Sequence, residues 1–166
     1  MITAEYPRAM ARYNRWQNRS LVRAAATLSD AERRADRGAF FGSIVATLNH
    51  VLWDDRVWLA RLSGDADGAA AIGRRHPYTD TPERWSDYAS ERAALDERLI
   101  AWADGLADAD LGKRIEWLRG DEPMAESLGF YTVHLFNHQT HHRGQVHAML
   151  TAAGAAPGPT DLPVMA

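Results

Sequence analysis

The sequence predicts an all-α fold, a four-helix bundle in a single domain over residues 1–166. Two observations support this prediction: four long segments carry apolar residues at helical spacing, and the breaks between them contain glycine and proline. Helices of about 20 to 26 residues are about 30–40 Å long, which suits a bundle of this kind. A chain of 166 residues is also long enough to bury a sizeable core in one domain.

The composition limits the classes of function. The chain has 22 acidic residues, 19 basic residues, a formal net charge of -3 and no cysteine. Without cysteine there is no disulfide, thiolate zinc site, iron–sulfur cluster or cysteine nucleophile, so any metal must be held by His, Asp or Glu. The net charge gives no electrostatic footprint for nucleic acid or for an anionic membrane. Since there is neither a signal-like N-terminus nor a run of about 18 apolar residues, we expect a soluble cytoplasmic protein.

The first helix is predicted over residues 4–28. Its apolar residues recur at helical spacing; they are Met10, Tyr13, Trp16, Leu21 and Leu28. Ser29 and Glu32 have the spacing of a capping box, which predicts that this helix ends there and that a short helical turn begins.

A second helix is predicted over residues 42–62. The next stretch, residues 65–82, contains two glycines and two prolines and is predicted to be an irregular connector. Its length allows a crossover between the second and third helices. Thr81 and Pro82 have the chemistry of an N-cap and a first helical residue, which predicts that the third helix begins there and ends near residues 104–105.

The last third of the chain contains a candidate hairpin and a fourth helix. Residues 113–126 have Gly120 and Asp121 between two short runs, which is typical of a small hairpin. The fourth helix is predicted over residues 127–153, with Gly154 as the signal that ends it. The proline-rich tail that follows is predicted to be irregular.

Histidines crowd into the fourth helix. Seven are present in the chain, and five lie in this segment: His134, His138, His141, His142 and His147. Residues at positions i and i+4 of a helix have Cβ atoms about 6 Å apart, so two imidazoles at this spacing can converge on one ion. The intervening residues supply no glutamate base, which excludes the metalloprotease motif H-E-x-x-H.

The apolar stripe of the fourth helix selects one pair among these histidines. At about 100° per residue, the stripe is formed by Leu128, Leu135, Val146, Met149 and Leu150. His142 and then His138 lie nearest to it, whereas His134 and His141 lie further round and His147 points away. Inward imidazoles need partners, and a shared cation would supply one. The alternative is that these are hydrogen-bonded core or surface histidines.

Outside this cluster only His50 and His76 remain, and His76 lies in the connector. His50 is in the middle of the second helix, almost opposite its strongest apolar stripe, so the residues alone leave its orientation open. Apolar residues flank both sides of this helix. We interpret this two-sided burial as an indication of a homodimer.

Several motifs resemble the DinB/YfiT-like family over nearly the whole chain. Residues 13–18 read YNRWQN, similar to the family's Y-N-x-W-x-N start, and residues 138–145 read HQTHHRGQ, similar to its H-x-x-x-H-R-G-Q signature. The resemblance implies a four-helix bundle, commonly a homodimer, with a divalent metal held by one histidine of the second helix and two of the last. At the matching positions these ligands are His50, His138 and His142.

Three neutral imidazoles would leave coordination positions open to water or substrate, as in a catalytic site. Zinc or nickel is the expected metal, and iron or manganese is possible if waters complete a larger shell. Asp54, four residues after His50, is a candidate hydrogen-bond partner of a ligand or a base, with a solvated or capping aspartate as the alternative. Arg143 is a candidate partner for an acidic substrate or for a neighbouring carboxylate.

The resemblance implies a metal-dependent enzyme of the thiol S-transferase or isomerase type that acts on a small molecule. Related enzymes use bacillithiol or mycothiol, and here the thiol must come from outside because the chain has no cysteine. One alternative is metal-assisted hydrolysis with Asp54 as the base. Another is a non-catalytic, stress-associated metal-binding protein, for which the negative charge argues against direct binding of DNA.

Overall fold

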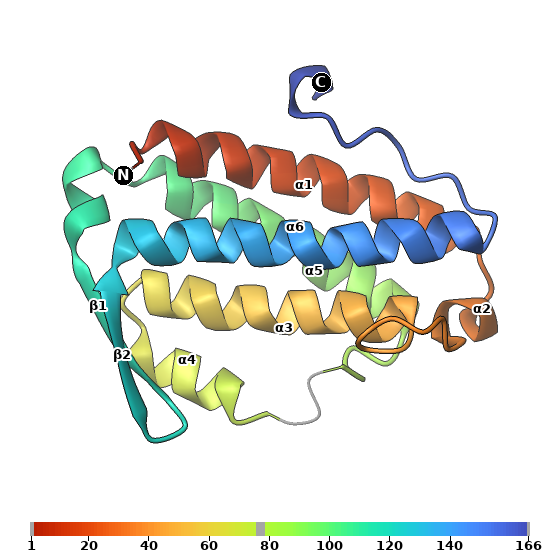
Figure 1. The fold of residues 1–166 in the computed structure, drawn as a ribbon, viewed down its shortest axis with the longest axis horizontal. Coiled ribbons are helices and arrows are strands. Elements are labelled where there is room, and N and C mark those ends of the chain that lie inside the picture. The colour runs from red at the N-terminus through yellow and green to blue at the C-terminus, as the bar shows by residue number, and fades with distance from the viewer. Residues whose placement is uncertain (1, 76–78, 166) are drawn as a thin grey trace.

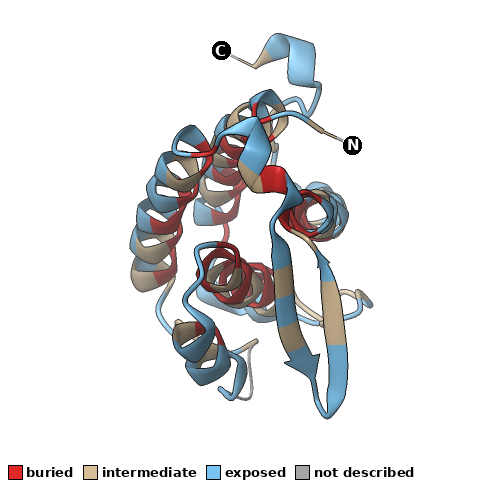
Figure 2. Ribbon diagram, turned by 90° about the vertical axis from the view of Figure 1, so that its left-hand side faces the viewer, coloured by how far each residue is buried: buried red, intermediate tan, exposed pale blue. Residues whose placement is uncertain are grey.

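Four long helices lie side by side in the fold (Figure 1): α1 (Glu5–Ala26), α3 (Ile44–Leu62), α5 (Trp85–Asp104) and α6 (Leu128–Ala152). The computed structural model describes residues 2–75 and 79–165. α1 packs on α5 and α6, and α3 packs on α6 and α5. Figure 2 shows the buried residues on the faces that these helices turn toward one another. Their fully buried apolar side chains include Ile44, Leu52, Leu99, Leu135 and Leu150.

Shorter elements complete the fold: the helices α2 (Asp30–Arg34) and α4 (Ala66–Gly73), the 3-10 helices η1 (Asp108–Gly112) and η2 (Leu162–Val164), and the strands β1 (Arg114–Arg119) and β2 (Glu122–Ser127). The two strands form an antiparallel hairpin, so the hairpin prediction is confirmed and the fold is mostly rather than wholly helical. None of the helices within residues 2–75 and 79–165 combines the length and apolar content needed to cross a membrane.

Helix α3 is covered on both of its sides within one chain. Its strongest apolar stripe, which includes Ile44, Leu48 and Leu52, belongs to the core. Its other side faces α6 and α4, and the Trp53 indole Nε1 donates to the carbonyl oxygen of Ile72 in α4 at 3.0 Å. The two-sided burial therefore has a cause inside the chain, and the homodimer stays a prediction.

Two predictions about the connector are wrong. Residues 66–73 form α4 because Asp65 caps it, its carboxylate accepting from the amide of Gly68 at 2.9 Å, and because alanines between the two glycines favour a helix. The third long helix begins at Trp85 rather than at Pro82. The Asn49 side-chain amide donates to the carbonyl oxygens of Thr79 and Pro82, both at 3.2 Å, and this ties the segment to α3 instead of to a helical turn. His76 and Pro77 of the connector lie outside the described residues.

The predicted helix ends are otherwise close to those observed. Ser29 and Glu32 form the capping box that begins α2. Gly154 follows α6 with a φ of 80°, a conformation that glycine adopts without strain. α3 starts at Ile44, two residues later than predicted, because Gly42 has a φ of 78° and Ser43 caps the helix.

We expect Ser127→Ala to lower the free energy of unfolding by about 1 kcal/mol, which for a chain of this size shifts Tm by about 2–4 °C. Ser127 Oγ accepts from the amide of Phe130 at 3.2 Å and so caps α6. Thermal unfolding followed by circular dichroism measures the shift. Ser90→Ala, on the exposed face of α5, is the control and should leave Tm nearly unchanged. Equal shifts in the two variants would contradict the cap.

Candidate metal centre

Three histidines from two helices converge on one point. His50 comes from α3, and His138 and His142 come from successive turns of α6. One ligand atom from each ring lies within 4.8 Å of the other two. The Nε2 atoms of His50 and His138 are 3.2 Å apart, although these residues are separated by 88 positions in the chain. The structure therefore brings together the pair selected from the apolar stripe, His138 and His142, and the third histidine that the family resemblance implied, His50.

The local sequence explains this arrangement. The i, i+4 spacing places His138 and His142 on the same face of α6, with ring centroids 4.4 Å apart, and the packing of α3 against α6 places His50 opposite them. The loop before α3 covers the cluster from another side. There the ring of Phe41 lies 4.1 Å from that of His50 and 5.4 Å from that of His142, between centroids.

Polar partners orient two of the three imidazoles. Asp54 Oδ2 lies 3.0 Å from His138 Nδ1, and His142 Nδ1 donates to Gln145 Oε1 at 2.8 Å. The amide nitrogen of Gln145 in turn donates to His141 Nε2 at 3.2 Å. A proton held at Nδ1 leaves the lone pair at Nε2 available to a metal.

The geometry of the donor set fits a divalent metal. Two nitrogen ligands at about 2.0–2.1 Å from a tetrahedral ion lie about 3.3–3.4 Å from each other. The separation of 3.2 Å between His50 Nε2 and His138 Nε2 is close to this value. The third histidine offers a donor atom within 4.8 Å of the other two. Imidazoles without thiolates suit zinc, nickel or iron.

The environment of the site also favours the neutral, metal-binding form of two ligands. Burial lowers the pKa of His50 to about 4, although the charge of Asp54 opposes this shift. Burial also lowers the pKa of His142, against the effect of its hydrogen bond to Gln145. For His138, burial acts in the same direction, but the hydrogen bond and charge of Asp54 outweigh it and the pKa is raised. Asp54 is therefore the carboxylate that most affects the cluster.

The remaining histidines of α6 lie outside this cluster. His134 is exposed and its ring contacts that of Trp58, with centroids 4.9 Å apart. His141 is exposed and bonds to Gln145. His147 is half-buried in a depression between α1 and α6, on another face of the helix. The choice made from the apolar stripe of α6 agrees with these positions.

Arg143 is not brought to the metal centre. It is buried, and its guanidinium donates to the side-chain oxygen of Asn14 in α1 and lies over the ring of Tyr13, 5.6 Å from the ring centroid. Burial lowers its pKa to about 10. The proposed partners, an acidic substrate or a neighbouring carboxylate, are thus replaced by a neutral amide.

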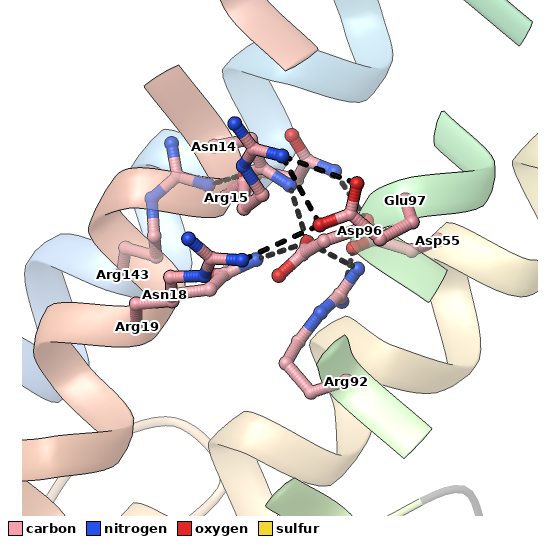
Figure 3. Close-up of polar contacts among 10 residues, drawn as sticks. Asn14, Arg15, Asn18, Arg19, Asp55, Arg92, Asp96, Glu97 and Arg143 are labelled. Atoms are coloured by element: carbon pink, nitrogen blue, oxygen red, sulfur yellow. Dashed lines mark hydrogen bonds and ion pairs between the residues drawn. The ribbon is translucent and has the colours of Figure 1, made fainter. Parts of the chain in front are cut away.

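Arg143 belongs instead to a buried polar network that joins all four long helices (Figure 3). Arg92 of α5 is at its centre, with Nη1 2.5 Å from Asp55 Oδ2 and Nη2 2.9 Å from Asp96 Oδ1. Asn18 of α1 donates to Asp96 Oδ1 at 2.8 Å. Gln139 of α6 donates to Asp55 Oδ1 at 2.7 Å. The members are nearly inaccessible to solvent, so every charge depends on its partners within the protein.

This network adjoins the histidine cluster. Asp55 follows Asp54, and Gln139 follows His138, so two parallel contacts join α3 to α6: Asp54 to His138 and Asp55 to Gln139. Asp55, Gln139 and Gln145 are partners of the site that the sequence did not indicate. The i, i+3 spacing of His142 and Gln145 on one helix could have indicated Gln145. Asp55 and Gln139 meet only through the packing of α3 on α6, which the sequence does not reveal.

The comparisons with known proteins agree with this picture. A family model described as "DinB family" matches residues 1–166. The chain is 27% identical over 151 residues to a protein named "Protein DinB" from Bacillus subtilis (strain 168), a match that covers 90% of this chain and 87% of that protein. No solved structure matches the chain. From the match over its full length, the chain belongs to the DinB family.

Proposed function

We propose that this protein is a metal-dependent enzyme of the thiol S-transferase or isomerase type, with a divalent ion held by His50, His138 and His142. The observation that carries the proposal is the convergence of three imidazoles from α3 and α6, with donor atoms within 4.8 Å of one another. Three protein ligands leave at least one coordination position for a further group, which is the arrangement of catalytic rather than structural sites.

The chemistry of the donors guides the choice of metal and cosubstrate. Three nitrogen donors favour zinc or nickel, with iron or manganese as alternatives when waters add to the shell. A bound divalent ion lowers the pKa of a coordinated thiol or water and so supplies a nucleophile at neutral pH. Since the chain contains no cysteine, an external low-molecular-weight thiol would have to provide the sulfur.

The protein's own side chains have distinct tasks in this proposal. Asp54 lies against Nδ1 of His138, and Gln145 accepts from Nδ1 of His142, so that both Nε2 atoms would be available to hold the ion. The ring of Phe41 covers His50 and shields one side of the site from water. His138 and Asp54 have side chains that are 19% and 13% exposed, so solvent reaches the site on this side.

We also propose a four-helix bundle as the fold class and one domain over residues 1–166. The packing of α1, α3, α5 and α6 supports the first, and the match of one family over the full length supports the second. We keep the homodimer as a proposal on the family resemblance. The cytoplasm is the proposed location because small thiols remain reduced there.

The experiment that tests the enzymatic proposal measures thiol consumption. Protein made without a histidine tag is loaded with zinc or nickel and mixed with bacillithiol or mycothiol and an electrophile such as 1-chloro-2,4-dinitrobenzene. We expect the loaded protein to consume thiol faster than the uncatalysed reaction does. The chelated protein and His142→Ala should show only the uncatalysed rate. Metal retention without turnover across the panel would contradict the enzyme and favour a metal-binding protein.

Metal-assisted hydrolysis receives less support from the geometry. It requires a general base beside the metal-bound water, and Asp54 was the candidate. The Asp54 carboxylate instead contacts His138 Nδ1 at 3.0 Å, where it orients a ligand. We therefore do not propose hydrolysis as the main activity.

We expect Asp54→Asn to weaken metal binding by about 10- to 100-fold, because the amide cannot accept from His138 Nδ1 as strongly as the carboxylate does. Competition with a chromophoric chelator measures the affinity. The control is Glu91→Gln, which neutralises an exposed carboxylate whose partner is Arg56, away from the cluster. An affinity of Asp54→Asn within about twofold of the control would show that Asp54 does not support the ligand.

A further inference from the structure

A second candidate binding site lies near the opposite end of α3 from His50. A groove of about 420 Å³ is formed by the end of α3, the start of α4 and strand β1. Small-molecule sites have volumes of about 300–1,000 Å³ and are lined mainly by apolar groups. The walls of this groove are mostly apolar and include Ala66, Ala69, Ala70, Ile115, Trp117 and Leu118.

One polar group in the groove, Arg61, is held in a fixed position by two indole rings. Its guanidinium carbon lies 3.9 Å from the ring centroid of Trp117 and 4.8 Å from that of Trp58. Trp58 itself is buried in the core, so the support is rigid. The two indole rings are nearly perpendicular, at 80°, so they confine the guanidinium on two sides. An arginine held over aromatic faces can still pair with a carboxylate through its N–H groups.

The charge of Arg61 is not matched by a contacting carboxylate among residues 2–75 and 79–165. Asp54, whose charge acts on Arg61, contacts His138 instead. The two other charged residues of the groove, Arg114 and Glu116, neutralise each other at 2.9 Å. The groove therefore presents apolar walls and one guanidinium that no carboxylate of the described residues contacts.

We propose that this groove binds a small organic acid, with its carboxylate paired to the edge of the Arg61 guanidinium and its flat apolar part between α4 and β1. Arg–carboxylate pairs are often bidentate, and the apolar walls account for the rest of the contact area. None of the three clustered histidines lines the groove, and Arg61 follows His50 by 11 residues, about 16 Å along the helix. The charge of Asp54 acts on both residues. The proposal does not depend on a bound metal.

The test uses the full chain, freed of metal by a chelator, and compares two matched probes. 4-Phenylbutyrate and its neutral amide, 4-phenylbutyramide, are titrated against ¹⁵N-labelled protein while the indole N–H signals are followed by NMR. The Trp117 signal is assigned with Trp117→Phe. We expect the acid to shift the Trp117 signal and to bind at least about tenfold more tightly than the amide, because only the acid forms the charge-assisted pair.

Two variants locate the binding. Arg61→Met keeps an apolar stem beside Trp117 and should weaken binding of the acid by about tenfold or more. Arg84→Gln removes the same charge outside the groove, from an exposed arginine that pairs with Asp87 at 2.8 Å, and should keep the affinity within about threefold.

Four results would contradict a site for an organic acid in this groove. Equal affinity for acid and amide, an unchanged affinity in Arg61→Met, or no shift of the Trp117 signal would each overturn the proposal. Displacement of the acid by inorganic phosphate at equal concentration would also overturn it, since a simple anion would then suffice. The comparison of the two probes on the unmodified chain decides the question even if Arg61→Met does not fold.

Discussion

Alanine substitution of His50, His138 or His142 is expected to remove nearly all bound metal. Each residue supplies one of three donor atoms that lie within 4.8 Å of one another, and a divalent ion held by two imidazoles alone has lost a third of its protein ligands. Substitution of residues that only support a ligand already costs about 10- to 100-fold in affinity, so loss of a ligand should exceed about 100-fold. Elemental analysis of protein purified without a histidine tag measures the metal content.

The matched controls are other histidines of the same helix. His134 is exposed and its ring contacts that of Trp58, and His147 lies on a different face of α6. His134→Ala and His147→Ala should therefore keep the metal content of the unmodified protein. Equal metal loss in all five variants would refute the site. Circular dichroism of each variant separates loss of the ligand from loss of the fold.

Arg92→Met is expected to cause the largest loss of stability in this protein. Arg92 is 1% exposed and contacts two carboxylates, those of Asp55 and Asp96, that are 0% and 2% exposed. Removing the cation leaves both carboxylates buried without their charged partner, and breaking such a pair costs about 3–5 kcal/mol. At about 2–4 °C per kcal/mol, Tm should fall by about 6–20 °C. Chemical denaturation gives the free energy of unfolding directly.

A surface ion pair between the same helices supplies the control. Arg15 of α1 contacts Glu97 of α5 at 3.1 Å, with side chains 32% and 55% exposed. Arg15→Met should therefore cost less than about 1 kcal/mol. A loss below 1 kcal/mol in Arg92→Met as well would mean that the buried network does not stabilise the fold. If Arg92→Met does not fold at all, Arg92→Lys, which keeps the charge but not the planar fork, should fold with a reduced Tm.

The sequence was most informative where a local signal had no competitor. The apolar spacing of α1 and α6, the capping box of Ser29 and Glu32 and the end signal Gly154 each act within a few residues, and the structure agrees with them. At Thr81 and Pro82 the same kind of signal failed, because a distant side chain, that of Asn49, binds the carbonyl groups of the segment. Local chemistry cannot reveal that contact.

In the candidate site, too, some residues could be predicted from local sequence and others depend on packing between helices. The pair His138 and His142 follows from helical spacing and the apolar stripe of α6. His50 does not, because α3 is buried on both sides and its strongest stripe faces away from the ligand, so the family resemblance was needed to choose it. For Arg143 the residue type allowed an anionic partner, but packing against α1 gives it the amide of Asn14 instead.

The distance along the chain between the two halves of the cluster affects when it forms. His138 and His142 become neighbours as soon as α6 is helical, whereas His50 joins them only after the chain has closed a loop of 88 positions. Closing a loop of this length lowers the conformational entropy of the chain, and this loss precedes the stabilising contact between the histidines. Helix α6 by itself therefore holds two of the three donors, and the complete set requires the native packing of α3 on α6.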